Sequence, residues 1–370
     1  MNKEKKVELI ELFYDLIYVY AISNLTKLLQ TESADIFSDF GRYFILCLVI
    51  LQAWLYLTNY VNRYGEWNRY EYLLTTINMM ATIYMANTIS DDWQIVSRSF
   101  NLAMLVMLGC VLMMYVLQLF RKSSDTSAAR NSILILSIVC ILYFIAYLLS
   151  YFHIHQFVLP VDVAAVLTGA FLPFVLKGKF SSGIIHFPHL VERLELITII
   201  TFGECIVGIT DYFDVNFVSL SAVLVFADVL LLFGCYVLQI HRLCDHEQDA
   251  RALKIMFSHY LIVISLNLFT ITLAYAKDIN AARSFNIAMM IIVLVMFFVS
   301  LYVNSSYYRK GMTFSCRDAL ITLASAAAGL AVMLGMSDKT MAVLCGTAVI
   351  AAVNFCLLLY KYEHMPDHES

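Results

Sequence analysis

The chain has 370 residues, of which 61% are hydrophobic and only 14% are charged. Soluble domains are about half apolar and about a quarter charged, so this composition excludes an ordinary soluble fold. The formal net charge of −4 gives no reason to expect nucleic acid as a partner, and the lipid bilayer is the partner that the apolar surplus requires.

Apolar stretches recur along the chain, and each is about 20 residues long, the length that spans the hydrocarbon core of a bilayer. Because lipid cannot satisfy free backbone groups, each stretch is expected to form a helix. We therefore predict an all-α fold, a polytopic transmembrane bundle of about twelve helices. The predicted spans in chain order are 7–29, 39–62, 70–90, 98–120, 131–151, 157–176, 190–211, 217–240, 255–276, 284–305, 315–335 and 339–360.

The segments that join these spans alternate between basic segments and segments poor in lysine and arginine. The residues ahead of the first span are basic, and Lys277 with Arg283 is the main exception in the other set. Because basic loops stay in the cytoplasm, the alternation predicts a multi-pass protein of the cytoplasmic (inner) membrane with both termini cytoplasmic. A missed or false span would break the alternation, so the pattern also favours an even number of helices.

A short motif, V-E-x-x-E-L, occurs at Val7 and again at Val191. Six predicted helices separate the two copies, which favours a parallel internal repeat of six plus six helices, an architecture found in transporters. The halves would be residues 1–186 and 187–370, within one integral membrane domain. A chance match of six residues is the alternative, and the sequence leaves both open.

The first span carries acids at depths where charge is expensive. A charged group at mid-bilayer costs at least a few kcal/mol, so it survives when it faces a partner, the bundle interior or water. Glu8, Glu11 and Asp15 fall within roughly 60° of one another on a helix. The functional interpretation is a proton or cation site, and the structural one is a carboxylate paired with arginine or hydrogen-bonded to neighbours.

The seventh span places His189, Arg193 and Glu204 within roughly 60° on one helical face. Arg193 and Glu204 are about 16 Å apart along the axis and cannot pair, so Arg193 needs a partner such as Glu11 or Asp15 from another helix. Gly203 would let a neighbouring helix or a ligand approach Glu204 closely. The structural alternative is close helix packing around a protonated Glu204.

Other polar residues within the spans are weaker candidates. Trp54 and Tyr56, near the cytoplasmic end of the second span, fit an interfacial aromatic belt. Single acids occur at Asp162 and Asp228, and a lone histidine at His259. Such residues usually bond to neighbours within the bundle, although His259 could also relay protons.

The sequence gives no reason to expect a metal, a cofactor or a catalytic residue. The cytoplasmic residues His241, Cys244, Asp245 and His246 could bind zinc, but no second Cys/His pair occurs at the spacing of a zinc site. We find no phosphate-binding glycine loop, no G-x-S-x-G elbow and no H-E-x-x-H motif. A catalytic function would have to rest on the same intramembrane acids and histidines, and the sequence favours a protein that is not an enzyme.

Three motifs resemble one known family. Residues 11–19 read E-L-F-Y-D-L-I-Y-V, similar to its opening E-L-F-F-D-L-V-F-V. Residues 58–64 are similar to its Y-T-N-R-F region, and the H-L-V-E-R at 189–193 with the G-E-C-I-V at 203–207 resembles its H-x-x-E-R and G-E-S-I-V. The chain thus resembles the bacterial low temperature requirement A family.

The resemblance implies a multi-pass membrane protein whose family name records a growth phenotype in the cold. It supplies no substrate, reaction or catalytic residues. The chain departs from the family pattern at Tyr14 and Tyr18, where the family has phenylalanine, and at Cys205, where it has serine. The motif residues coincide with the acids selected above from the cost of charge alone.

The sequence favours a transporter or channel with an intramembrane carboxylate site built by the first and seventh spans. Asp15 and Glu204 would bind an ion or proton, and Arg193 would supply the counter-charge. The remaining site residues lie at the cytoplasmic mouth, namely Glu11, His189 and Glu192. The partners would be the bilayer and an unidentified small solute or ion, and a homo-oligomer is left open.

Two other functions stay open. One is a membrane protein that does not transport but senses or adjusts the bilayer in the cold, and the other is an intramembrane enzyme acting on lipid. A transporter should have a water-accessible cavity beside Asp15 and Glu204, whereas a sensor should bury these acids in closed pairs. An enzyme should have a site open sideways to lipid.

Overall fold

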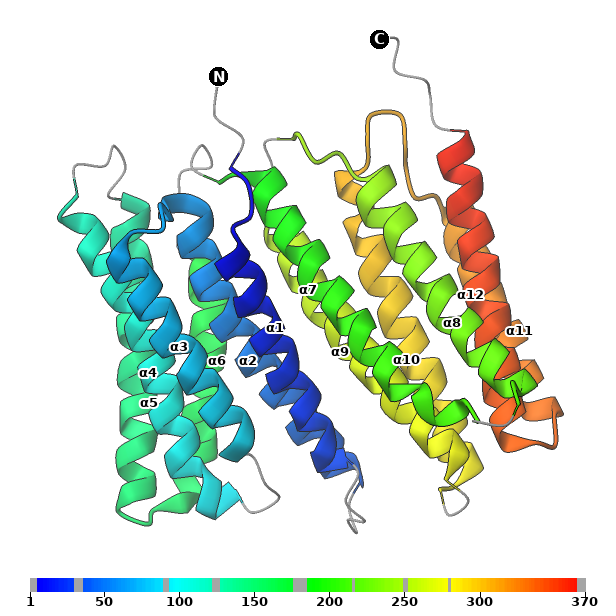
Figure 1. Cartoon of the computed structure of the whole chain (residues 1–370), viewed down its shortest axis with the longest axis horizontal. Coiled ribbons are helices and arrows are strands. Elements are labelled where there is room, and N and C mark those ends of the chain that lie inside the picture. Colours follow the sequence, from blue (N-terminus) through cyan, green and yellow to red (C-terminus); the bar gives the residue numbers. More distant parts are fainter. Residues whose placement is uncertain are drawn as a thin grey trace. The chain divides into compact units, whose positions relative to one another are not determined.

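The computed structural model describes residues 5–29, 36–88, 93–121, 127–175, 185–214, 217–248, 252–278 and 281–364. Within them the chain forms twelve α-helices and no strand (Figure 1). The helices are α1 Leu9–Leu25, α2 Ile36–Tyr64, α3 Arg69–Thr88, α4 Trp93–Leu119, α5 Ser127–Tyr151, α6 Val158–Val175, α7 Phe187–Gly208, α8 Leu220–Tyr236, α9 Leu253–Lys277, α10 Arg283–Val303, α11 Cys316–Gly335 and α12 Lys339–Glu363. Each predicted span corresponds to one helix, with ends that agree within five residues, so the all-α bundle is confirmed.

Among the described residues, nine helices are long and apolar enough to cross a membrane. The other three, α1, α3 and α7, are shorter or more polar. These three helices turn polar side chains inward. Asn78 of α3 and Asp15 of α1, for example, are 0% exposed.

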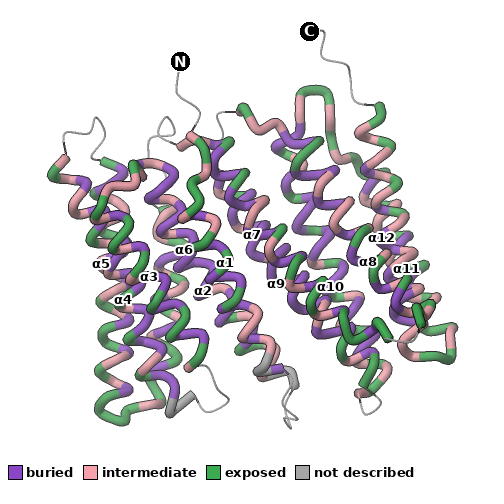
Figure 2. Tube along the Cα trace, in the orientation of Figure 1, coloured by how far each residue is buried: buried purple, intermediate pink, exposed green. Residues whose placement is uncertain are grey.

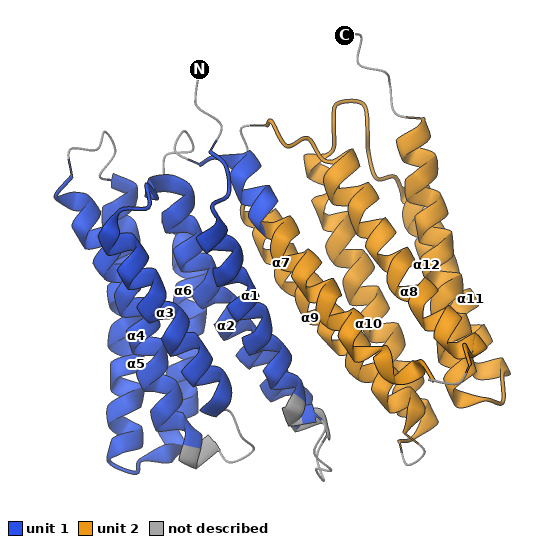
Figure 3. Cartoon of the chain, viewed as in Figure 1, with its two compact units in different colours: residues 1–193, 249–251 blue, residues 194–248, 252–370 orange. Residues whose placement is uncertain are grey.

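The helices form two compact units, residues 1–193 with 249–251 and residues 194–248 with 252–370 (Figure 3). The division falls inside α7, so the first two turns of this helix belong to unit 1 and the remainder belongs to unit 2. The six-plus-six repeat, with halves that meet after residue 186, stays a prediction.

Unit 1 is built on α1, which packs against α2 and α3. The helix α3 packs against α4, α4 against α5, and α5 against α6. Polar side chains join these helices. The Tyr18 hydroxyl donates to Asn78 Oδ1 at 3.1 Å, and Asn78 Nδ2 donates to the Met107 carbonyl at 2.9 Å. These bonds tie α1, α3 and α4 together where lipid and water are both excluded.

Unit 2 pairs α9 with α10, α11 with α12, and α8 with α12. Of the most apolar stretch of α9, 83% is buried, against 22% of that of α11, a contrast that Figure 2 displays residue by residue. The helix α11 therefore presents most of its apolar side chains outward, as a lipid-facing helix does. At its C-terminal end, α8 continues into a π-helical turn, Val237–Leu243.

Candidate functional site

Four titratable side chains of unit 1 meet within the bundle, and we call them the charge cluster: Glu11, Asp15, His189 and Arg193. Glu11 and Asp15 lie one turn apart on the buried face of α1, and His189 and Arg193 lie one turn apart at the start of α7. None of the four is more than 1% exposed. Both pairs use the four-residue spacing that places side chains on the same face of a helix.

Arg193 bonds to both acids of the charge cluster. Its Nε donates to Asp15 Oδ2 at 3.0 Å and its Nη2 donates to Asp15 Oδ1 at 2.5 Å, which makes a two-pronged contact. The remaining Nη1 donates to Glu11 Oε2 at 2.5 Å. The planar guanidinium matches this arrangement because its N–H groups form a rigid fork. The contact between Arg193 and the acids of the first span, which the sequence suggested, is present.

Aromatic side chains also contact the charge cluster. The indole N–H of Trp54 in α2 donates to Asp15 Oδ1 at 2.7 Å, and that of Trp67 donates to Glu11 Oε1 at 3.3 Å. The guanidinium carbon of Arg193 lies 5.7 Å from the Trp54 ring and 5.9 Å from the Tyr14 ring, within cation–π range. Trp67 has a φ of 55°, a left-handed backbone that non-glycine residues rarely adopt.

His189 has a defined orientation beside Glu11. Its Nε2 lies 3.3 Å from Glu11 Oε2, and its Nδ1 lies 3.1 Å from Asn62 Nδ2. An amide nitrogen is a donor, so Nδ1 acts as the acceptor, and a neutral His189 carries its proton on Nε2, towards Glu11. Asn62 also exchanges two hydrogen bonds with the backbone of His186, which fixes the start of α7 against the end of α2.

Lys5 and His186 lie outside the spans, at the end of the unit where α2 ends and α7 begins. Lys5 Nζ donates to the carbonyls of Val61, Asn62 and Gly65 at the C-terminal end of α2, where the helix dipole favours a cation. Burial lowers the pKa of Lys5. The pKa of His186 is also lowered, first by burial and then by the nearby charge of Lys5.

The structure separates two predicted residues from the charge cluster. Glu192 is exposed, because it directly precedes the inward-facing Arg193 on α7. Glu204 is half-buried further along α7 and belongs to unit 2. A methyl group on Gly203 would meet nothing within 4 Å in the described part of unit 2, so the expected close approach of a neighbouring helix is not found there.

Trp54, Trp67 and Asn62 contact the charge cluster although the sequence did not assign them to a site. The interfacial-belt interpretation of Trp54 is wrong, since this residue is 1% exposed and bonds to Asp15. A signal was available, because the position of Trp54 is ten residues from the end of α2, about 15 Å from that end. This depth is greater than that of the membrane surface, where belt residues lie.

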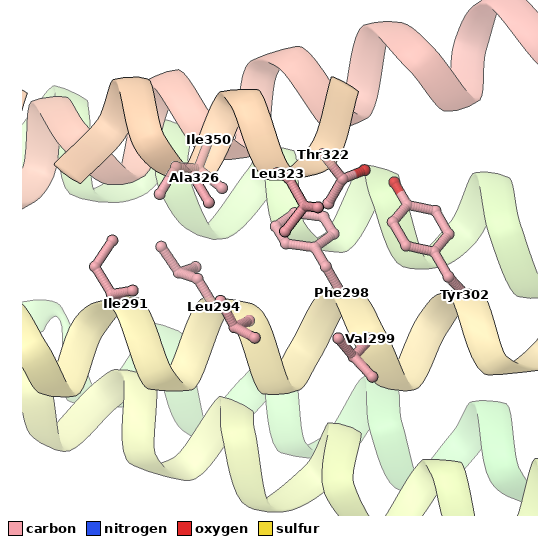
Figure 4. A pocket seen from close by; sticks show the side chains of 10 residues that line it. Ile291, Leu294, Phe298, Val299, Tyr302, Thr322, Leu323, Ala326 and Ile350 are labelled. Carbon is pink, nitrogen blue, oxygen red and sulfur yellow. The ribbon is translucent and has the colours of Figure 1, made fainter. Parts of the chain in front are cut away.

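A hollow elsewhere in unit 2 has a different character (Figure 4). It contains about 420 Å³ of empty space, part of it open to the surroundings. Its lining comes from α10, α11 and α12: Ile291, Leu294, Val295, Phe298, Val299, Tyr302, Thr322, Leu323, Ala326 and Ile350. No acid or histidine lines it. Among the residues that the structure describes, no group of three or more histidine, cysteine, aspartate or glutamate side chains could hold a metal ion.

The apolar helices and the internal ion pairs define a multi-pass helical membrane protein. The family model of the bacterial low temperature requirement A protein (LtrA) matches residues 6–355. The chain therefore belongs to the LtrA family, and the resemblance of its motifs is confirmed. No curated protein matches the chain.

Proposed function

We propose that this protein is a proton-coupled transporter or channel of the cytoplasmic membrane, with both termini in the cytoplasm. The observation that carries the proposal is the buried Arg193 bonded to Glu11 and Asp15 with His189 beside them. With His189 neutral, two carboxylates and one guanidinium leave one net negative charge. A net charge away from water is costly, so the charge cluster favours uptake of one proton.

A proton would also change the contacts of the charge cluster. His189 points Nε2 towards Glu11, so a proton on either side chain alters the attraction between Glu11 and its neighbours. A neutral Glu11 would hold Arg193 less strongly, because a hydrogen bond to an ionised acceptor is about twice as strong as a neutral one. Protonation thus provides a reason for α1 and the start of α7 to separate.

The remaining predicted residues have separate roles in the proposal. Glu204 serves as a second carboxylate further along α7, and Glu192 serves at the cytoplasmic mouth. Lys5 and His186 would lie at the same mouth, which agrees with the positive-inside orientation. The transported species is a small solute or ion.

A second candidate is a membrane protein that senses or adjusts the bilayer without transport. The burial of the charge cluster favours this second candidate, since Glu11, Asp15 and Arg193 are at most 1% exposed. In that case the ion pairs stabilise the packing of α1, α2 and the start of α7, and no ion passes. The two candidates differ in whether the buried acids exchange protons during function.

The deciding experiment is flux in proteoliposomes that contain the purified protein. An internal pH dye and a membrane-potential dye report movement under imposed proton and cation gradients. The variants are Asp15→Asn and Glu11→Gln, with Glu363→Gln as the control, because Glu363 is exposed at the end of α12 and lies outside the proposed site. Wild-type flux that both cluster variants lose and the control keeps would support transport. Folded wild-type protein without flux under any of these gradients would favour the second candidate.

A further inference from the structure

The helix α8 of unit 2 carries a buried acid that the charge cluster does not include. Asp228 lies eight residues from each end of α8, Leu220 and Tyr236, so it is about 12 Å from either end along the axis. It is 0% exposed. An aspartate side chain is too short to reach the membrane surface from this depth.

Neither carboxyl oxygen of Asp228 has a hydrogen-bond partner among the described residues. Two titratable groups are close enough to respond to its charge, Tyr212 and Cys345. The Tyr212 hydroxyl donates its hydrogen to the Leu273 carbonyl at 2.7 Å, so this hydrogen is not available to Asp228. A thiol such as that of Cys345 is only a weak donor.

No basic side chain of the described residues forms an ion pair with Asp228. A basic side chain lies near Tyr212, because Lys277 Nζ is 5.0 Å from the centre of the Tyr212 ring. This Nζ donates to the Asp211 carbonyl at 2.5 Å. Asp228 therefore lacks the counter-charge that Arg193 gives to Asp15.

A second polar atom without a partner lies on the helix packed against α8. Thr347 Oγ1 of α12 is buried and has no hydrogen-bond partner in the described part of the chain. The helices α8 and α12 run in the same direction, since Cys235 contacts the Ala351 carbonyl and, further along, Arg242 lies over the Tyr362 ring. Asp228 lies seven residues before Cys235, and Thr347 lies four residues before Ala351. Along the two parallel helices their positions therefore differ by about 4.5 Å, less than one turn.

We propose that Asp228 is a proton-binding site of unit 2, which holds its carboxyl group in the protonated form at neutral pH. An ionised carboxylate without a partner in such surroundings is far more costly than a neutral acid. An alkali or divalent cation would need about six oxygen ligands, and among the described residues no group of three or more histidine, cysteine, aspartate or glutamate side chains could hold a metal ion there. The site goes beyond the proposed function, because it lies outside the charge cluster and does not require transport.

Carbodiimide labelling tests the protonation state on the intact protein in proteoliposomes. Dicyclohexylcarbodiimide reacts with the acid form: a carboxyl oxygen bonds to the central carbodiimide carbon, and the carboxyl proton moves to a carbodiimide nitrogen. The acyl group then shifts to nitrogen and leaves a stable N-acylurea, which peptide mass spectrometry locates. We expect the label on Asp228 at neutral pH and less label as the pH rises, while Asp15, held ionised by Arg193, stays unlabelled.

Infrared spectroscopy gives a second test that does not depend on access of the reagent. Asp228→Asn should remove one C=O band of a protonated carboxyl group and leave the carboxylate bands unchanged. The same substitution at Asp15 should remove a carboxylate band instead. Loss of a carboxylate band in Asp228→Asn would overturn the proposal whatever the labelling shows. If this variant does not fold, labelling of the wild-type protein decides, and an unlabelled Asp228 beside a labelled Glu204 would then overturn it.

Discussion

Asp15 and Asp228 are the same residue type at the same burial, and their surroundings are opposite. Asp15, in unit 1, receives two hydrogen bonds from Arg193 and one from Trp54. Asp228, in unit 2, receives none from any described residue. A buried acid can survive in either way, as an ion paired with a cation or as a neutral acid. The comparison predicts that removing charge has unequal consequences in the two units.

The largest effect should follow removal of the cation from the charge cluster. Arg193→Met leaves Glu11 and Asp15 buried and repelling each other, so we expect a loss of about 3–5 kcal/mol in the free energy of unfolding. Unfolding of the purified protein in detergent, followed by circular dichroism against denaturant, measures it. Arg317→Met is the control, because Arg317 is exposed.

A triple variant separates lost charge balance from lost packing. Arg193→Met combined with Glu11→Gln and Asp15→Asn removes every formal charge of the pairs, so it should recover most of the stability that the single variant loses. If Arg193→Met alone is as stable as the wild type, Arg193 does not neutralise these acids in the membrane.

The next effect should come from Asp15→Asn. The substitution leaves Glu11 and Arg193 balanced, but it replaces a two-pronged ionic contact by a neutral one. We expect a loss of about 2 kcal/mol, the range for hydrogen bonds to charged groups. The same unfolding measurement on Glu192→Gln should give no change, since Glu192 is exposed. Equal losses in both variants would mean that the effect is not specific to the buried pair.

A smaller effect should follow Trp54→Phe. Phenylalanine keeps an aromatic ring near Arg193 and removes the N–H that donates to Asp15 at 2.7 Å. Asp15 keeps both bonds from Arg193, so we expect a loss of about 1 kcal/mol. The double variant Trp54→Phe with Asp15→Ala completes a mutant cycle, because alanine removes the acceptor, and a coupling energy near zero would then contradict the bond.

The sequence predicted some of these features for physical reasons that can be stated. The twelve helices were predictable because each span needs an apolar length that the bilayer fixes. Glu11, Asp15 and Arg193 stood out because charge is costly at their depth. Their pairing could be suggested but not located, since the sequence gives the position along a helix and not its rotation against a neighbour.

Other features were missed for the same reason. Tryptophan is a residue type typical of the interfacial belt. Only the orientation of α2 towards α1 shows that Trp54 bonds to Asp15. The exposure of Glu192 follows from the rotation of about 100° between neighbouring residues once Arg193 faces inward. Asp228 has no polar neighbour in the sequence, so nothing in the pattern separates a functional acid from a packing residue.

The smallest effect should be that of Asp228→Asn, and it is the strictest test of the comparison. The chemical change equals that in Asp15→Asn, and both positions are 0% exposed. If the carboxyl group of Asp228 is already neutral, the substitution exchanges one uncharged polar group for another of similar volume. We then expect a change in unfolding free energy within about 0.5 kcal/mol, measured beside Asp15→Asn in the same detergent. A loss as large as that of Asp15→Asn would mean that Asp228 makes a strong polar contact in the membrane, and the distinction between the two acids would then disappear.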